Sequence, residues 1–228
     1  MIKIEKTEIL GWEAAIRGMR NPLNSWEKSD SYWTHIEDAE TLETAPFQFF
    51  LGENDLDLMK RLRNAGTDHR KFMRMITVYV DLTAPLYWWK EFDTYKVGTV
   101  ANSCSTMHKI HANEFTLDDF SHEHLCKDGI HLLKTIIEAL NDCRELHQDY
   151  EKFLVLGEFD PSITSKKDIW WQMIQLLPSS YNQKRTVLLN YEVLANIYKS
   201  RKNHKLDEWH DFCHWIEDLP YSNLIVGD

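Results

Sequence analysis

Glycine is scarce in this sequence, with only 8 among 228 residues, and none of them belongs to a GxGxxG or P-loop pattern. Such glycine loops hold phosphates in Rossmann and P-loop enzymes, so the sequence disfavours both classes. No apolar run is long enough to span a bilayer, and the opening residues MIKIEKTEIL contain no apolar signal-peptide core. These absences predict a cytoplasmic protein that is not inserted in a membrane.

Cysteine is also sparse. The 4 cysteines (Cys104, Cys126, Cys143 and Cys213) are far apart and form no CxxC pair. This pattern is typical of a reduced intracellular protein and not of a disulfide scaffold.

One part of the chain nevertheless concentrates metal-ligand side chains, namely Cys104, His108, His111, His122, His124 and Cys126. The residue types suit zinc, but the tight spacing of structural zinc sites is absent, so we predict a histidine-rich loop and no metal site. A nucleophilic Cys104 with His108 as its base is an alternative, although nothing in the sequence indicates an activated thiol.

The sequence has fewer cationic than anionic residues. It contains 26 Lys and Arg residues and 36 Asp and Glu residues, which gives a formal net charge of -10. Because such a chain repels phosphate overall, we expect no nucleic-acid partner, while a local basic pocket for one nucleotide is compatible with the composition. The 9 tryptophans are many for this length and fit a core, a flat ligand site or a subunit interface.

Length and composition indicate one globular domain over residues 1–228. Strands are expected at 2–4, at 73–82 and shortly after 186. Helices are expected at 11–20, 53–65, 86–93, 130–153, 166–177, up to about 200, and at 205–218. Asn54 is the expected cap of the second helix, and the polar stretch LNSWEKSDSYW is expected to be a solvated loop or a phosphate-binding lid.

The chain is organised around the stretch from Phe72 to Lys109. It opens with FMRMITVYVDL, whose β-branched and aromatic residues predict a strand. Ala84-Pro85 follows, and because proline is tolerated in a first helical turn, an aromatic helix is expected at 86–93. The small and polar residues around Gly98 then predict a loop placed to meet a ligand.

The order of these pieces matches that of a known family. In TAPLYWWKEFDTYKVGTVANSCSTMHK a strand leads into an Ala-Pro helix and then into a loop of spaced polar residues. Further matching positions are Ala65-Gly66, His69, Leu177-Pro178, Asn190, Asn196 and Arg201. On these residues the stretch 56–209 resembles the flavin-dependent thymidylate synthases, in which an Arg-His-Arg loop follows the helix.

Several positions depart from that family's pattern, and many of the departures remove a cation. Thr94, Tyr95 and Lys96 stand where the family has Arg-His-Arg. The other replacements are Thr99 and Cys104 for two serines, Ala101-Asn102 for Asn-Glu, Thr106-Met107 for Arg-Tyr, and Ile174 and Glu192 for two arginines. Losing one arginine–phosphate contact costs about 1.5–3 kcal/mol, so phosphate affinity should fall by orders of magnitude without a substitute. The candidate substitutes are Arg70, Arg74, Lys96 and Lys109.

The resemblance implies an α+β fold with a mixed sheet and long helices, and a homotetramer whose subunits share active sites. It also implies FAD as cofactor and a pyrimidine nucleotide such as dUMP as partner. By matching position, the cofactor-binding residues are His69, Thr94, Lys96, Asn190 and Asn196. The substrate-binding residues are Thr99, Cys104 and Arg201, with Lys96 and Thr99 on the phosphate side and Arg201 at the base. No catalytic residue is predicted.

Two functions remain open at this point, besides a metal-dependent enzyme at the Cys/His loop. The first is a divergent enzyme that transfers a one-carbon unit to a pyrimidine nucleotide with the help of a reduced flavin. The second is a catalytically inactive relative that serves as a ligand-binding or protein-interaction module, and the altered Arg-His-Arg region favours it.

Overall fold

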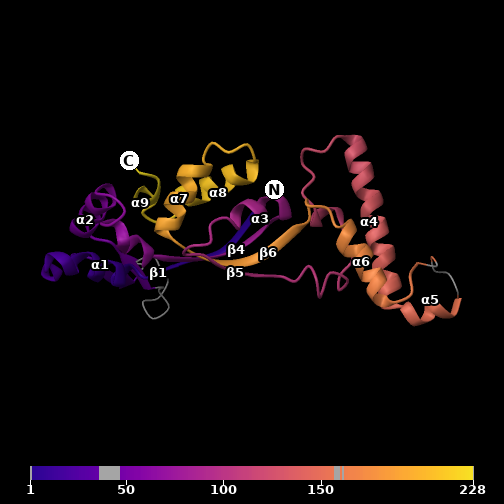
Figure 1. Cartoon of the computed structure of the whole chain (residues 1–228). Helices are drawn as coiled ribbons and strands as arrows, with labels where there is room; N and C mark the ends of the chain where they lie inside the picture. Colours follow the sequence, from indigo (N-terminus) through magenta and orange to yellow (C-terminus); the bar gives the residue numbers. More distant parts are fainter. Residues whose placement is uncertain (1, 36–46, 157–159, 161, 228) are drawn as a thin grey trace. The chain divides into compact units, whose positions relative to one another are not determined.

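A computed structural model describes residues 2–35, 47–156, 160 and 162–227 of the chain (Figure 1). The chain divides into two compact units. Unit 1 comprises Met1–Lys3, Leu82–Thr94 and Asn102–Thr186, and unit 2 comprises Ile4–Asp81, Tyr95–Ala101 and Val187–Asp228. Helices and strands are both present, as predicted for the α+β class, while a single domain over 1–228 stays a prediction.

A four-stranded sheet has the strand order β1-β4-β6-β5. The strands are β1 (Lys3–Leu10), β4 (Thr77–Pro85), β5 (Val100–Ser103) and β6 (Asn182–Asn190). In β4 the buried side chains of Val78, Val80 and Leu82 alternate with more exposed ones. This alternation is typical of a strand that packs one face against a core.

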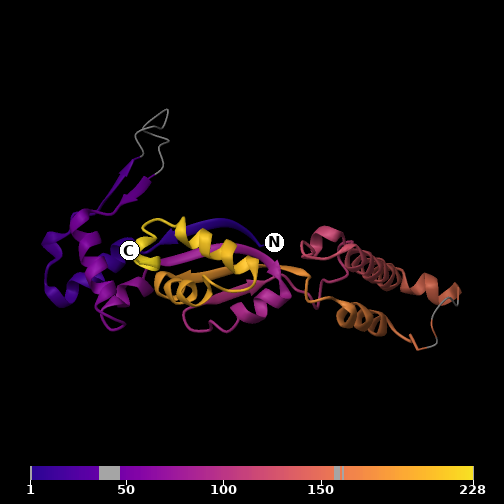
Figure 2. The ribbon, with the colours of Figure 1, turned by 90° about the horizontal axis from the view of Figure 1, so that it is seen from above.

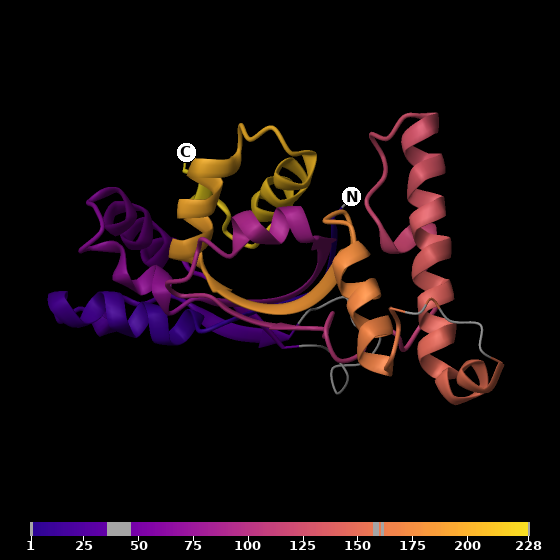
Figure 3. The same ribbon diagram turned by 45° about the vertical axis from the view of Figure 1, so that its right-hand side comes forward.

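The helices of unit 2 are α1 (Trp12–Arg20), α2 (Glu53–Asn64), α7 (Tyr191–Arg201), α8 (Asp207–Glu217) and α9 (Asn223–Val226). Three short 3-10 helices accompany them: η1 (Asn21–Leu23), η2 (Trp26–Lys28) and η3 (Arg70–Arg74). Two further strands, β2 (Tyr32–His35) and β3 (Phe47–Phe50), pair antiparallel with Trp33 opposite Phe49. Figure 3 shows α7, α8 and α9 gathered together, and each of the three packs on the other two.

The helices of unit 1 are α3 (Leu86–Phe92), α4 (Lys127–Gln148), α5 (Tyr150–Leu156) and α6 (Lys166–Leu176), with the short 3-10 helix η4 (Leu117–Asp119). Helices α4 and α6 run side by side (Figures 2 and 3). Leu133, Ile137 and Leu140 follow helical spacing on α4 and are buried with Met173 of α6. They form a hydrophobic core with Phe115, Phe120 and Ile110.

A buried carboxylate ties together the N-terminal part of unit 2. Asp55 is fully buried and accepts hydrogen bonds from Arg20 Nε at 2.7 Å and from the hydroxyls of Ser29 and Ser31, each at 2.7 Å. Burial by itself raises the pKa of Asp55, but the hydrogen bonds from Ser31, Ser29 and Arg20 outweigh it and hold the pKa below the ordinary 3.8. Ser29 and Ser31 therefore donate to a structural carboxylate, whereas the sequence was also compatible with their binding a phosphate.

Most helices match their predictions. The predicted helices at 11–20 and 86–93 are confirmed as α1 and α3, and α6, α7 and α8 also lie where expected. The helix predicted at 130–153 is two helices, α4 and α5. The N-cap of α2 is Gly52 and not Asn54, because the Asp30 carboxylate accepts the free N–H groups of Asn54 and Asp55 at 2.9 and 3.1 Å.

The strand predictions need more correction. The predicted start of the central strand is wrong, since Phe72 and Met73 belong to η3 and β4 begins at Thr77. The first strand extends to Leu10 and is longer than expected. The segment after Gly98 was expected to be loop, but Val100–Ser103 is the strand β5. None of the helices among the described residues is both long and apolar enough to cross a membrane.

Candidate functional site

The loop of residues 95–99 packs against α7. The hydroxyl of Tyr95 accepts a hydrogen bond from Arg201 Nε at 2.8 Å, and the carbonyl of Gly98 accepts one from Asn190 Nδ2 at 3.5 Å. Gly98 has φ +79°, and an added Cβ would lie only 2.9 Å from Asn190 Nδ2. Glycine is therefore needed here both for its backbone conformation and for the close approach.

Arg201 is fixed by aromatic neighbours. Its guanidinium carbon lies 4.7 Å from the ring centroid of Trp209 and 5.5 Å from that of Tyr95. The two rings meet edge to face at 6.2 Å, and Trp209 is fully buried. A guanidinium held in this way is preorganised, so it loses little conformational entropy when it binds a planar ligand. Sequence reasoning identified Arg201 but missed Tyr95 and Trp209 as its supports.

Asn190 has a structural role at the start of α7. Its Oδ1 accepts the N–H of Val193 at 3.0 Å, which caps the helix. Its Nδ2 is the donor to Gly98. Both the oxygen and the nitrogen of the Asn190 carboxamide thus form hydrogen bonds within the chain, and the residue is 9% exposed.

Glu192 joins two arginines of η3. Its carboxylate contacts Arg74 Nε, Arg74 Nη2 at 3.4 Å and Arg70 Nε at 3.2 Å. Arg70 Nη2 also donates to Asn196 Oδ1 at 3.4 Å. Two of the cations that could have replaced the missing arginines are therefore paired with a carboxylate.

The charge of Glu192 is stabilised by this pairing. Burial alone would raise its pKa, but the hydrogen bonds and charges of Arg74 and Arg70 keep the pKa below the ordinary 4.5. The carboxylate is therefore ionised throughout the neutral range. Sequence reasoning noticed that Glu192 stands in place of an arginine but did not identify its partners, which lie 118 and 122 positions away.

Replacing Glu192 by Gln should lower the free energy of unfolding by about 1–3 kcal/mol at pH 7, because charge-assisted hydrogen bonds to a buried carboxylate are lost. Since the folded pKa is lowered, this stabilisation is complete above pH 4.5 and is lost as the pH falls through the folded value. Urea titrations of both proteins at pH 7 and pH 3.5 measure it. Glu138→Gln, an exposed change on α4, is the control, and an equal loss in both variants would contradict the assignment.

Three other predicted residues, Thr99, Lys96 and His69, also belong to unit 2. Thr99 donates its hydroxyl to the carbonyl of Tyr95, and Lys96 is exposed in the same loop. His69 is exposed and immediately precedes η3. The loop that carries Lys96 and Thr99 thus contacts Asn190 and Arg201 of unit 2 through Gly98 and Tyr95.

Two predicted residues belong to unit 1. Thr94 follows α3 and donates its hydroxyl to the carbonyl of Glu91 at 2.7 Å. Cys104 has an exposed thiol, its backbone carbonyl accepts a hydrogen bond from Gln183 Nε2 at 3.0 Å, and its N–H donates to the Lys184 carbonyl at 2.9 Å. In the described part of the chain no three His, Cys, Asp or Glu side chains are grouped so that they could hold a metal ion.

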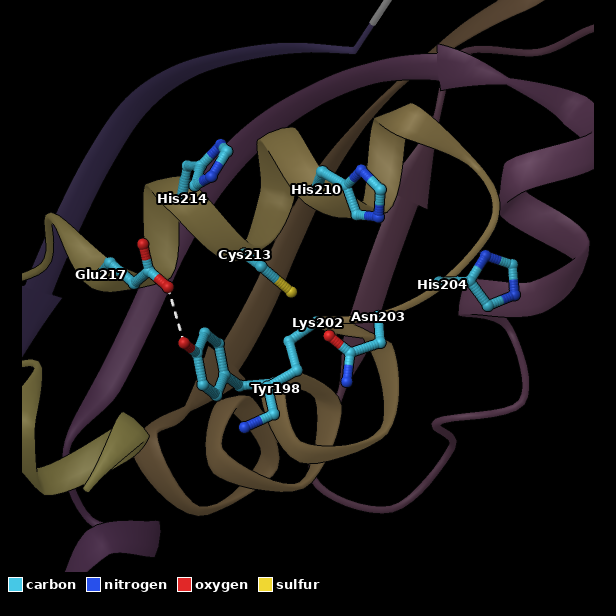
Figure 4. A pocket seen from close by; sticks show the side chains of 8 residues that line it. All are labelled: Tyr198, Lys202, Asn203, His204, His210, Cys213, His214 and Glu217. Atoms are coloured by element: carbon cyan, nitrogen blue, oxygen red, sulfur yellow. Dashed lines mark hydrogen bonds between the residues drawn. The ribbon is translucent and has the colours of Figure 1, made fainter. Parts of the chain in front are cut away.

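A polar pocket with a volume of about 610 Å³ lies on α7 and α8 (Figure 4). It is lined by Tyr198, Lys202, Asn203, His204, His210, Cys213, His214 and Glu217. Tyr198 donates its hydroxyl to Glu217 at 2.6 Å, a contact that raises the pKa of Tyr198 to about 12. Burial raises the pKa of Cys213 to about 11, so its thiol is protonated at neutral pH and is a poor nucleophile.

The chain is similar over nearly its whole length to two solved structures. One is the flavin-dependent thymidylate synthase ThyX from Helicobacter pylori complexed with FAD and dUMP, with 15% sequence identity, a TM-score of 0.63 and 98% of each chain covered. The fold is that of ThyX. A second structure of Helicobacter pylori ThyX with FAD and dUMP has 14% identity and a TM-score of 0.63, and covers 99% of this chain and 98% of the other.

No protein-family model and no curated protein matches the sequence. The ThyX fold is therefore evident from the three-dimensional comparison alone. At 15% identity the similarity shows the fold and not the roles of the side chains around α7.

Proposed function

We propose that this chain is a divergent member of the flavin-dependent thymidylate synthase family that binds a pyrimidine nucleotide, a flavin, or both. The observation that carries the proposal is the cation–aromatic assembly of Arg201, Tyr95 and Trp209. It fixes a guanidinium against the loop that carries Lys96 and Thr99, at the end of the helix that the resemblance assigns to ligand binding. ThyX structures of the same fold hold FAD and dUMP.

Four residues of this chain are proposed to contact the nucleotide. Arg201 would hold the base, because a guanidinium suits the carbonyl oxygens of a planar pyrimidine. Lys96 and Thr99 would lie on the phosphate side, and Cys104 would complete the substrate residues.

The proposed flavin contacts are His69, Thr94, Lys96, Asn190 and Asn196. Asn196 and His69 are exposed and fit this role, whereas the carboxamide of Asn190 is already used by α7 and Gly98. A bound reduced flavin would supply a hydride. The residues present fit a nucleotide better than the two phosphates of FAD, because Glu192 neutralises Arg70 and Arg74.

Thermal unfolding in the presence of dUMP tests the nucleotide proposal. We expect dUMP to raise the unfolding temperature of the unaltered chain, because a ligand that binds only the folded state stabilises it. Arg201→Ala should weaken dUMP affinity by about tenfold to a hundredfold, which corresponds to one charge-assisted contact. Arg17→Ala, an exposed change on α1, is the control. Unchanged dUMP affinity in Arg201→Ala would contradict the assignment.

A second function is favoured by the carboxylate of Glu192 between Arg70 and Arg74. The chain would then be a catalytically inactive relative that serves as a ligand-binding or protein-interaction module. The visible spectrum of the purified protein separates the two functions. Flavin bands support a flavin-binding relative, while a colourless protein that FAD and dUMP do not stabilise supports the module. Light scattering after size exclusion tests the homotetramer that we also propose.

A further inference from the structure

A small pocket of unit 2 is lined by four cationic side chains and no acidic one. Its volume is about 190 Å³. The lining residues are Arg63, Arg70, Ala195, Asn196, Tyr198, Lys199, Lys202, Ile225 and Val226. In a chain with a formal net charge of -10, such a local excess of positive charge creates a field that attracts anions.

The cations come from three different elements. Arg63 belongs to α2 and Arg70 to η3, while Lys199 and Lys202 lie at the end of α7. A cation at the C-terminal end of a helix is favourable against the helix dipole, which accounts for Arg63 on α2 and for Lys199 and Lys202 at the end of α7. The dipoles do not explain why these two helix ends and Arg70 of η3 line the same pocket.

Arg63 is held firmly by the chain. Its Nε donates to the Leu224 carbonyl at 3.0 Å, its Nη2 to the Ile225 carbonyl at 3.3 Å and its Nη1 to Asn64 Oδ1 at 2.8 Å. These contacts use three of the five N–H donors of the guanidinium. Within the described residues, one N–H group on Nη1 and one on Nη2 therefore have no acceptor. Two N–H groups on the terminal nitrogens of a guanidinium suit two oxygens of one anion.

The charges of the two lysines are not neutralised by the described part of the chain. Neither Lys199 nor Lys202 forms an ion pair with a carboxylate there, and both are exposed. Lys202 Nζ lies 5.8 Å from the centre of the Tyr198 ring, beside which Figure 4 shows it. Arg70 is the exception, since Glu192 shares its charge.

We propose that this pocket binds a phosphate group, either as the free ion or as a phosphomonoester. Its volume of about 190 Å³ suits one such group, the cations supply charge-assisted donors, and the apolar side chains of Ile225 and Val226 limit its size. The site shares Arg70 and Asn196 with the surroundings of α7, but it requires neither a nucleotide base nor a flavin.

Calorimetric titration of the full chain with inorganic phosphate tests this site, with sodium chloride of the same ionic strength as the blank. The double variant Lys199→Gln/Lys202→Gln should bind phosphate about tenfold more weakly or worse, because it loses two charge-assisted contacts. Lys166→Gln/Lys167→Gln removes the same charge from exposed positions of α6 and should leave the affinity within about twofold.

Ribose 5-phosphate serves as a second titrant. Tighter binding of the sugar phosphate assigns the site to a phosphomonoester, and tighter binding of phosphate assigns it to the free ion. Equal unfolding temperatures of the two double variants without phosphate show that both are folded. Arg201→Ala should retain phosphate binding, because Arg201 does not line this pocket. A failure of the nucleotide proposal can therefore be distinguished from a failure of the phosphate site. No binding above the chloride blank, or an equal loss in both double variants, would overturn the site.

Discussion

Asp55→Ala is expected to lower the free energy of unfolding by about 3–5 kcal/mol, because removing one partner of a buried ion pair leaves the other charge uncompensated. Arg20 is only 3% exposed and would keep its charge without its 2.7 Å contact. The hydroxyls of Ser29 and Ser31 would also lose their acceptor. Urea unfolding monitored by tryptophan fluorescence measures the loss.

Asp57→Ala is the matched control for this prediction. Asp57 lies on the same helix but is exposed, so its removal should change stability by less than about 0.5 kcal/mol. The pH dependence gives a second check. Because the pKa of Asp55 is lowered, its contribution is complete above pH 3.8 and disappears as the pH falls through the folded value. A deficit in Asp55→Ala that stays constant down to pH 2 would exclude the charge as its cause.

Trp209→Ala is also expected to lower the free energy of unfolding strongly. Trp209 is fully buried and packs edge to face on Phe212 with ring centres 5.8 Å apart. Truncating a buried tryptophan to alanine costs about 3–5 kcal/mol. The same change removes the ring under the Arg201 guanidinium, so dUMP affinity should fall together with stability.

A conservative variant separates these two consequences. Trp209→Phe keeps an aromatic ring below Arg201 and should retain most of the dUMP affinity while lowering stability less. Trp26→Ala is the control, because Trp26 is 51% exposed and should cost less than about 1 kcal/mol. If Trp209→Ala destabilises the chain no more than Trp26→Ala does, the packing described for α8 is wrong.

Local patterns were sufficient to predict most helices. Trp12, Ala15, Ile16 and Met19 follow the spacing of one helical face, and all four are buried in α1. The central strand was harder, because FMRMI at its start has the same apolar composition as the strand that follows. The carbonyl of Phe72 instead accepts the N–H of Met75, a local turn bond that β-propensity does not detect.

The candidate site was only half predictable. The motif order singled out Arg201, Asn190 and the loop from Thr94 to Thr99, and their ligand-binding roles stay predictions. It did not identify the partners that fix these side chains, since hydrogen bonds such as those between Arg201 and Tyr95 span 106 positions. Such pairs depend on tertiary packing, and one sequence contains no periodic signal for them.

Gly98 couples two positions that are 92 residues apart. A methyl group there would press on the amide of Asn190 and on Val193, and would act as a wedge between the loop and the helix. A substitution at 98 would therefore require smaller side chains at both 190 and 193, or a shift of the loop away from α7. Related sequences that lack glycine at 98 should differ at 190 and 193 as well.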